Sequence, residues 1–316
     1  MVQATADPAT RPVGRDDGPR PAPPYRAQPP SAPAALTALL LSDGESPALL
    51  HLAGQLTHAL QRRGLLAILH PEPAGRTERE RFRGWLRTLG VGALVQVGGT
   101  SRCDRPSRQV QASLSGGIPL YGVRFPAEES AGLHFCVDDE LAADQVLGYL
   151  RGLGHTAIGC LLDGPGQSAA TGRESTYRAR GIQRVSLTST TPEGVRAATD
   201  AFLDAGCTAV VCGSALLALG ALATIRDRGL SAPGDLSLIS LEDAPPGRFA
   251  EPTLTALQPP VRQMAESVAD VLREALVDAP TPVPRLRFLG ASELRYAPDL
   301  VVRGSTGPAP VAGPAC

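Results

Sequence analysis

The chain has 316 residues, of which 43% are hydrophobic, and a formal net charge of −1 at pH 7. This length is sufficient for two lobes of ordinary domain size, whereas the near-neutral charge does not supply the basic face that non-specific nucleic-acid binding requires. All thirty basic residues are arginines, so the chain has neither a Schiff-base lysine nor a Walker-type phosphate-binding lysine.

No feature of the sequence indicates export or membrane insertion. No apolar segment follows a basic start as in a signal peptide, and no apolar run approaches the length of a membrane span. The six cysteines include no C-x-x-C pair and are expected to be reduced thiols. We therefore expect a cytoplasmic protein with no membrane contact.

The predicted elements begin after a proline-rich segment. Residues 1–34 contain nine prolines and few large apolar side chains, which predicts a disordered tail. The apolar run 36–41 is typical of a buried parallel strand, and leucines and alanines at helical spacing predict a helix that starts at Ser46 or Pro47. A second strand is predicted at 65–69, and strand–helix units continue from there.

A second round of strand–helix units starts at residue 157 and ends with strands near 286–289 and 300–302. Repeated units of this kind predict an α/β protein with two lobes, each a doubly wound parallel sheet. We assign 35–155 and 256–278 to the first lobe, 156–255 and 279–306 to the second, and 307–316 to a flexible tail. The chain is then expected to cross between lobes near 155–157, 245–255 and 279–285.

Three segments resemble a known family. They are Val137-Asp-Asp-Glu140 with the helix end Leu153-Gly-His155, the strand–helix–strand region from Thr208 to Asp243, and Leu300-Val-Val-Arg-Gly-Ser305. Together they resemble the effector-binding domain of LacI/GalR-type transcriptional regulators, over about residues 35–306. The resemblance implies a two-lobed fold similar to periplasmic sugar-binding proteins, a small-molecule effector such as a sugar, and a homodimer.

Ligands of open α/β sheets bind beyond the carboxyl ends of the strands. The loops at those ends are predicted at 42–46, 98–102, 138–140, 163–173, 213–215 and 241–245. Asp43 lies in the first loop and is either a ligand residue or an ordinary turn acid. Asp138 and Asp139 either bind hydroxyl groups or cap the following helix. Arg173 is either a ligand clamp or a solvated loop residue.

Two further loops depart from the family pattern. Ser214 and Ala215 stand where the resembling family usually has Asn-Asp. Part of the polar contact that this family makes with its effector is therefore missing. Leu241-Glu242-Asp243 matches the family's Phe-Asp-Asp with one longer acid, so Glu242 and Asp243 are expected to bind the effector. His155 follows a helix-ending glycine and is expected to bond backbone at a lobe crossing. The fold is thus predicted to be retained and the pocket altered.

Enzyme motifs such as G-x-S-x-G, H-E-x-x-H and the P-loop are absent. His51 and His58 lack acidic partners at ligand spacing, so no metal site and no cofactor are predicted. We therefore expect a sensor and not an enzyme. A periplasmic transport protein is disfavoured by the missing export signal.

The DNA-reading part of the resembling family is a helix-turn-helix with a hinge helix. Only 35 residues precede the first predicted strand, and the prolines of segment 1–34 disfavour helices. DNA binding is therefore expected only if a DNA-binding helix-turn-helix domain is supplied or if the contact with DNA is unconventional. Three explanations for the missing helix-turn-helix stay open: a start codon further upstream, a divergent regulator, and a protein that has lost DNA binding. The two leading hypotheses are a ligand sensor and a scaffold protein with a pocket that no longer binds small molecules.

Overall fold

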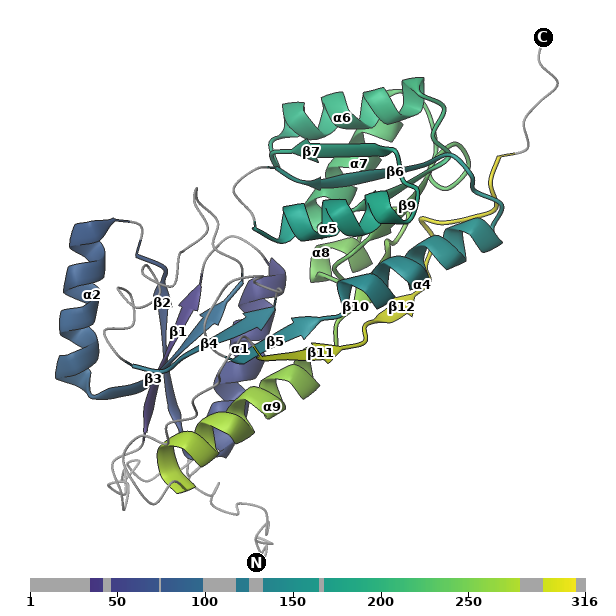
Figure 1. Ribbon diagram of the computed structural model, residues 1–316. Helices are drawn as coiled ribbons and strands as arrows, with labels where there is room; N and C mark the ends of the chain where they lie inside the picture. The colour runs from purple at the N-terminus through teal and green to yellow at the C-terminus, as the bar shows by residue number, and fades with distance from the viewer. Residues whose placement is uncertain are drawn as a thin grey trace, which may run out of the picture. The chain divides into compact units, whose positions relative to one another are not determined.

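The computed structural model describes residues 35–41, 47–73, 75–98, 118–124, 133–164, 168–278 and 292–310, which lie within one compact unit, Ala34–Cys316. The predicted tail 1–34 and the predicted strand 286–289 lie outside the described residues. The described strands form two six-stranded sheets, each covered by helices (Figure 1). The α/β class with two doubly wound lobes is confirmed.

The first lobe is built on a sheet with the strand order β11-β5-β4-β3-β1-β2, and every pair in it is parallel. Its strands are β1 (Leu36–Leu41), β2 (Leu66–Pro71), β3 (Val91–Val97), β4 (Leu120–Arg124), β5 (Leu133–Val137) and β11 (Ser292–Tyr296). Its described helices are α1 (Pro47–Arg62), α2 (Arg76–Leu89) and α9 (Val261–Arg273), which continues into a π-helical turn, η1 (Glu274–Asp278).

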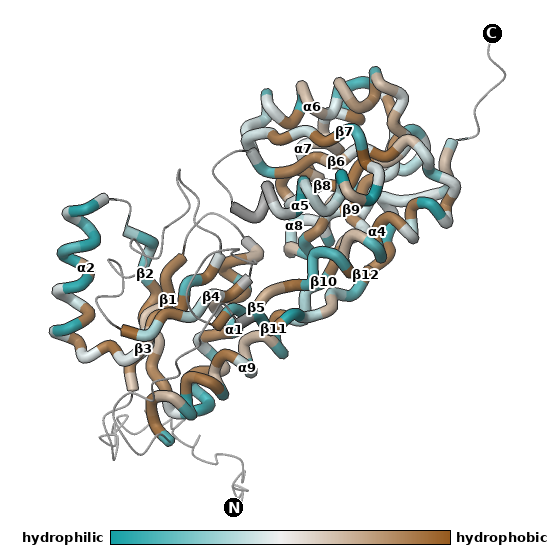
Figure 2. The backbone as a smooth tube through the Cα atoms, viewed as in Figure 1, coloured by the Kyte–Doolittle hydropathy of each residue, from teal (hydrophilic) through white to brown (hydrophobic). Residues whose placement is uncertain are grey.

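Hydrophobic patterning explains how these helices cover the sheet. Helices α1 and α9 bury an apolar stripe against one face, while α2 contributes only Phe82 and Leu86 to the other. Figure 2 shows the contrast, since β1 is strongly hydrophobic and α2 is largely hydrophilic along its length. A strand buried on both faces reads as a continuous apolar run, which is why β1 was predictable from sequence.

The second lobe has the strand order β12-β10-β9-β8-β6-β7, parallel except for the β10–β12 pair. Its strands are β6 (Ile158–Asp163), β7 (Arg184–Thr188), β8 (Ala209–Cys212), β9 (Ser237–Ser240), β10 (Thr255–Gln258) and β12 (Asp299–Val301). Its helices are α4 (Asp139–Gly152), α5 (Ser168–Ala179), α6 (Pro192–Asp204), α7 (Ala215–Asp227) and α8 (Pro245–Arg248). Apolar residues of α4 and α5 cover one face, and those of α6 and α7 cover the other.

The lobe boundaries differ from those expected. Helix α4 packs on the second sheet, β10 belongs to that sheet, and β11 pairs with β5 of the first sheet. The chain therefore crosses between sheets around residues 138, 259–260 and 297–298, and not near 155–157, 245–255 and 279–285. Strand–helix alternation fixes the order of elements, but long-range pairing decides which sheet each strand joins.

Residues 307–310 differ from the expected flexible tail at 307–316, whose residues 311–316 lie outside the described residues. The Gly307 carbonyl accepts hydrogen bonds from His155 and Ser237, and the Ala309 N–H donates to the Leu153 carbonyl. His155 also bonds Thr208 through its other ring nitrogen, at 2.9 Å. It thus bonds backbone as expected, but it secures the C-terminal segment within the second lobe and does not lie at a lobe crossing.

Candidate functional site

The carboxyl edge of the second sheet gathers several polar residues. Its strand order reverses between β6 and β8, and ligands of such sheets bind beyond the strand ends at this reversal. Leu161 pairs with Cys212, which pairs with Ser240, so β6, β8 and β9 end at a similar level. The residues at these three ends are Asp163, Gly213-Ser214 and Leu241-Glu242-Asp243.

Ser214 begins helix α7 as its N-cap. Its hydroxyl accepts a hydrogen bond from the Leu217 N–H and donates one to the Asp163 carboxylate, both at 3.4 Å. An N-cap side chain satisfies a backbone donor of the first helical turn. Ser214 therefore serves the fold, and it also orients Asp163, an acid that sequence analysis did not select.

Arg173 lies on α5 and is only 7% exposed, so it is not a solvated loop residue. Its Nε donates to Oδ1 of Asp139 at 3.2 Å, and its Nη1 donates to the Gly213 carbonyl at 3.3 Å. A buried guanidinium is tolerated when it is paired and hydrogen-bonded. These two contacts fix the charged group at the reversal point, between the starts of α4 and α7.

Asp138 and Asp139 have different tasks although they are adjacent. Asp138 is the N-cap of α4, and its Oδ1 accepts from the N–H groups of Glu140 and Leu141 at 3.1 and 3.0 Å. Asp139 instead pairs with Arg173. The structure thus gives the capping role to the first acid, while the second forms part of the site.

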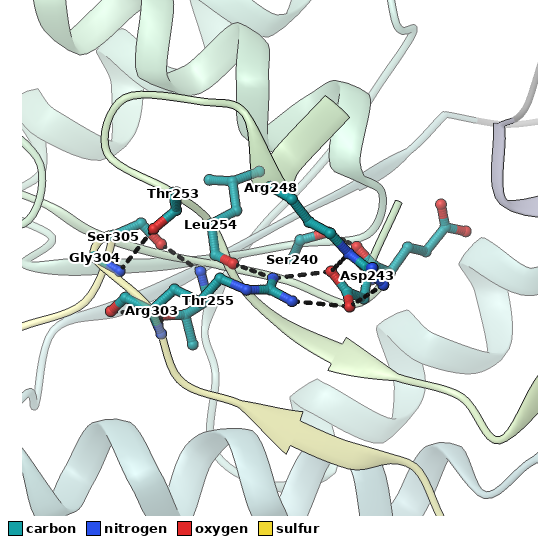
Figure 3. A network of polar contacts seen from close by, with 10 residues as sticks. Ser240, Asp243, Arg248, Thr253, Leu254, Thr255, Arg303, Gly304 and Ser305 are labelled. Atoms are coloured by element: carbon teal, nitrogen blue, oxygen red, sulfur yellow. Dashed lines mark hydrogen bonds and ion pairs between the residues drawn. The ribbon is translucent and has the colours of Figure 1, made fainter. Parts of the chain in front are cut away.

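Asp243 is held by two arginines (Figure 3). Arg303 bonds its Oδ1 and Oδ2 at 2.8 and 2.9 Å, and Arg248 bonds Oδ2 at 2.7 Å. Only 2% of the Asp243 side chain is exposed. Burial by itself would raise the pKa of Asp243, but the hydrogen bonds from Arg303 and Arg248 outweigh it, and the pKa lies below its usual value. This carboxylate is therefore ionised and engaged by the protein itself.

Arg303 ties the C-terminal segment to this loop. Its Nη1 donates to the Leu254 carbonyl at 2.6 Å, while its backbone N–H donates to Thr255. The hydroxyl of neighbouring Ser305 accepts from the Thr255 N–H (Figure 3). It also donates to the Leu238 carbonyl, so the C-terminal segment is bonded to both β9 and β10. Arg303 belongs to the segment that carried the family resemblance, but its ion pair with Asp243 was not predicted.

Glu242 is buried beside Asp243, with 9% of its surface exposed. The Ser240 hydroxyl accepts from the Glu242 N–H at 3.1 Å and donates to its carbonyl at 2.8 Å. A serine that bonds the backbone two residues further on stabilises a tight turn. The turn places Glu242 at the carboxyl edge of the sheet.

Two cavities adjoin this edge. The first, called the Arg173 cavity, measures about 20 Å³ and is lined by Arg173, Asp139, Tyr177 and apolar residues. The second, called the Glu242 cavity, measures about 50 Å³ and is lined by Glu242, Asp243, His51 and a mainly apolar wall from α1 and α9. They share Val137 and Pro259, so the two cavities are neighbours. Small polar groups beside an apolar wall are typical of sites for small molecules.

Tyr177 is an unexpected member of this group. It is 1% exposed, and its hydroxyl has no hydrogen-bond partner among the described residues. Burial raises the pKa of this hydroxyl well above its usual value, so it is protonated. An unpaired buried hydroxyl costs about 1–3 kcal/mol. No motif marks this tyrosine in the sequence, where it reads as a core aromatic.

The seven predicted site residues thus have different outcomes. Asp43 lies outside the described residues. The structure brings Asp139, Arg173, Glu242 and Asp243 to the two cavities, whereas Asp138 and Ser214 cap helices and line neither. Within the described part of the chain, no cluster of three metal-ligating side chains occurs, and no helix is long and apolar enough to span a membrane.

Comparison with known proteins gives a consistent result. Residues 147–306 match the model of the periplasmic binding protein-like domain. The chain is 30% identical over 292 residues to the HTH-type transcriptional regulator reg1 of Streptomyces lividans, covering 88% of this chain and 82% of that protein.

Solved structures share the fold. A transcriptional regulator CelR–cellobiose complex superimposes with a TM-score of 0.70 at 23% identity, covering 87% of this chain and 86% of that one. A LacI family regulator from Enterococcus faecium with bound ribose gives 0.68 at 19% identity, covering 86% and 99%.

Proposed function

The chain belongs to the LacI/GalR family of transcriptional regulators, and from this premise we propose that it is a sensor for an uncharged, sugar-like effector. The observation that carries the proposal is the buried Arg173–Asp139 pair at the reversal point of the second sheet, beside a cavity. An arginine held there presents N–H donors to ligand oxygens. Two structural neighbours contain cellobiose and ribose, which supports a saccharide.

Charge compensation favours a neutral ligand. Arg173 is already paired with Asp139, and Asp243 with Arg303 and Arg248. A charged ligand would have to compete with these pairs, whereas hydroxyl groups can bond the same atoms without changing the charge of the site. We therefore place the effector at Arg173, Asp139 and Glu242, with Asp243 holding the loop. Asp43 stays a predicted ligand residue, whereas Asp138 and Ser214 serve as helix caps.

A thermal-shift screen tests this proposal. The full chain is heated with glucose, ribose, cellobiose or lactose, and with gluconate and glucose 6-phosphate as anionic comparisons. A ligand at 100 times its Kd adds about 2.7 kcal/mol, which corresponds to a rise in Tm of about 5–10 °C for a protein of this size. Arg173→Gln should abolish that rise, whereas Arg178→Gln, on the exposed side of the same helix, should preserve it. A larger rise with the anionic sugars would contradict the neutral-ligand proposal.

The alternative function is an interaction or scaffold protein derived from the same family. It is favoured by Ser214, which caps a helix where the family usually has a ligand-binding Asn. On this alternative, no saccharide stabilises the wild-type chain, and partners are found among proteins. The same thermal-shift screen therefore separates the two functions.

We propose that the sensor is a homodimer. Strand β2 is an edge of the first sheet, and Leu66, Leu69 and nearby Trp85 are exposed there. Long apolar edge strands are normally covered, often by another chain. Sedimentation should give a dimer that Leu66→Asp converts to a monomer. Leu187→Asp, on the edge strand β7 of the second lobe, serves as the control; an equal effect of both would contradict a dimer through β2.

Regulators of this family bind DNA as well as an effector. We propose that any DNA contact belongs to a segment outside the two described lobes, because their sheets and helices already account for the sensor. Binding of the full chain to sheared DNA from its own organism, at low and physiological salt, tests this point. Retention that persists after removal of residues 1–34 would place the contact within residues 35–316 instead.

A further inference from the structure

Tyr177 lies on the same face of α5 as Arg173. The two residues are four positions apart, which places their side chains one helical turn from each other. Both line the Arg173 cavity together with Asp139. Three of the residues that line the cavity therefore carry polar groups: an arginine, an aspartate and a tyrosine whose phenol is protonated.

The phenol hydroxyl lacks a partner among the described residues although it is fully buried. Buried polar groups are nearly always hydrogen-bonded, so an exception calls for a specific reason. A phenylalanine would fill the same core position without an unpaired oxygen. A group that enters the cavity from outside the described residues would supply the missing partner.

The size and the walls of the cavity limit what can enter. Its volume of about 20 Å³ accommodates one oxygen-sized group. Ala142, Leu241 and Leu257 form apolar walls, and the charges of Arg173 and Asp139 compensate each other. An uncharged hydroxyl fits these conditions, because it can donate one hydrogen bond and accept another.

We propose that Tyr177 is a ligand-binding residue whose hydroxyl bonds directly to one hydroxyl group of the effector inside the Arg173 cavity. This inference rests on the proposed function, because it concerns the same site. It goes further by naming the residue that recognises one particular hydroxyl. A saccharide that lacks a hydroxyl at that ring position leaves the phenol unpaired and binds more weakly.

The test compares dissociation constants for the panel saccharide that binds the wild-type chain most tightly. Tyr177→Phe should weaken binding by about 3- to 10-fold, the usual effect of one lost hydrogen bond. Tyr149→Phe is the matched control, because the Tyr149 hydroxyl bonds Thr306 in the same lobe and lines neither cavity. It should bind like the wild type.

Monodeoxy analogues of that saccharide identify the hydroxyl involved. One analogue should bind wild type and Tyr177→Phe with equal dissociation constants, because the hydrogen bond to Tyr177 is then absent from both complexes. The other analogues should still bind Tyr177→Phe more weakly than wild type. Ala142→Val narrows the cavity from α4 and should also weaken binding, which provides a second test if Tyr177→Phe is poorly folded.

The outcomes separate this inference from the proposed function. Equal dissociation constants for wild type and Tyr177→Phe overturn the role of Tyr177 and leave the saccharide sensor intact. A dissociation constant that Ala142→Val leaves unchanged would likewise overturn the role of Tyr177 and leave the saccharide sensor intact. No binding of any panel saccharide to the wild type refutes the proposed function, and the role of Tyr177 fails with it.

Discussion

Replacing Asp243 with Asn should destabilise the second lobe strongly. Removing one member of a buried ion pair costs about 3–5 kcal/mol, because the remaining charge is left unpaired. Arg303 is 18% exposed and Arg248 is 48% exposed, so water can partly replace the lost carboxylate. We therefore expect a loss near the lower end, about 3 kcal/mol, or a fall in Tm of about 6–12 °C for a protein of this size.

Differential scanning calorimetry of Asp243→Asn measures this loss directly, with Asp200→Asn as the control. Asp200 pairs with Arg228 on the surface, where an ion pair contributes less than about 1 kcal/mol. In the double variant Asp243→Asn/Arg303→Gln, the cost should be smaller than the sum of the two single costs. A Tm for Asp243→Asn within about 1 °C of the control would refute the structural role of this carboxylate.

The ion pair also predicts a pH dependence. The pKa of Asp243 lies below its usual value of 3.8 in the folded chain. Its contribution to stability is therefore complete above about pH 4 and is lost as the pH falls through the depressed pKa. Urea unfolding at a series of acidic pH values should give a flatter profile for Asp243→Asn than for wild type. Parallel profiles would contradict the pKa assignment.

Three other predictions concern the scaffold of the site. Gly159→Ala places a Cβ 2.6 Å from the Phe202 ring and should lower the free energy of unfolding in urea by about 1–3 kcal/mol, whereas Gly148→Ala, which meets open space, should not. Burial lowers the pKa of His155 although the Gly307 carbonyl opposes this, so stability should fall as the pH drops below about 6.5, and His155→Gln should flatten that slope; identical slopes would contradict it. Ser214→Ala should cost about 1 kcal/mol through the lost α7 cap, similar to Thr191→Ala on α6, and a neutral effect would argue against the capping role.

The order of elements could be predicted because it depends on local apolar patterns. The continuous apolar run at β1 predicts a buried strand, and the helical spacing of the leucines in α1 predicts a helix. The lobe assignment failed at α4, β10 and β11, since pairing partners lie far away in sequence. Ser292–Tyr296, for example, pairs with β5 about 160 positions earlier, and nothing within the segment indicates this partner.

The site was predictable at the level of loops but not of individual roles. Acids after strands β5 and β9 pointed to the correct edge, because parallel strands end together. Whether an acid caps a helix, pairs with an arginine or meets a ligand depends on side chains elsewhere, such as Arg303 for Asp243 and Arg173 for Asp139. Tyr177 could not be found from sequence, because its unpaired hydroxyl is a property of the packed core.

Titration calorimetry of the full chain with the panel of neutral saccharides tests the central claim most directly. The account predicts that at least one saccharide binds once per chain and that Arg173→Gln abolishes the heat while Arg178→Gln preserves it. No heat with any saccharide, or binding that Arg173→Gln leaves unchanged, would contradict a sensor built on the Arg173–Asp139 pair.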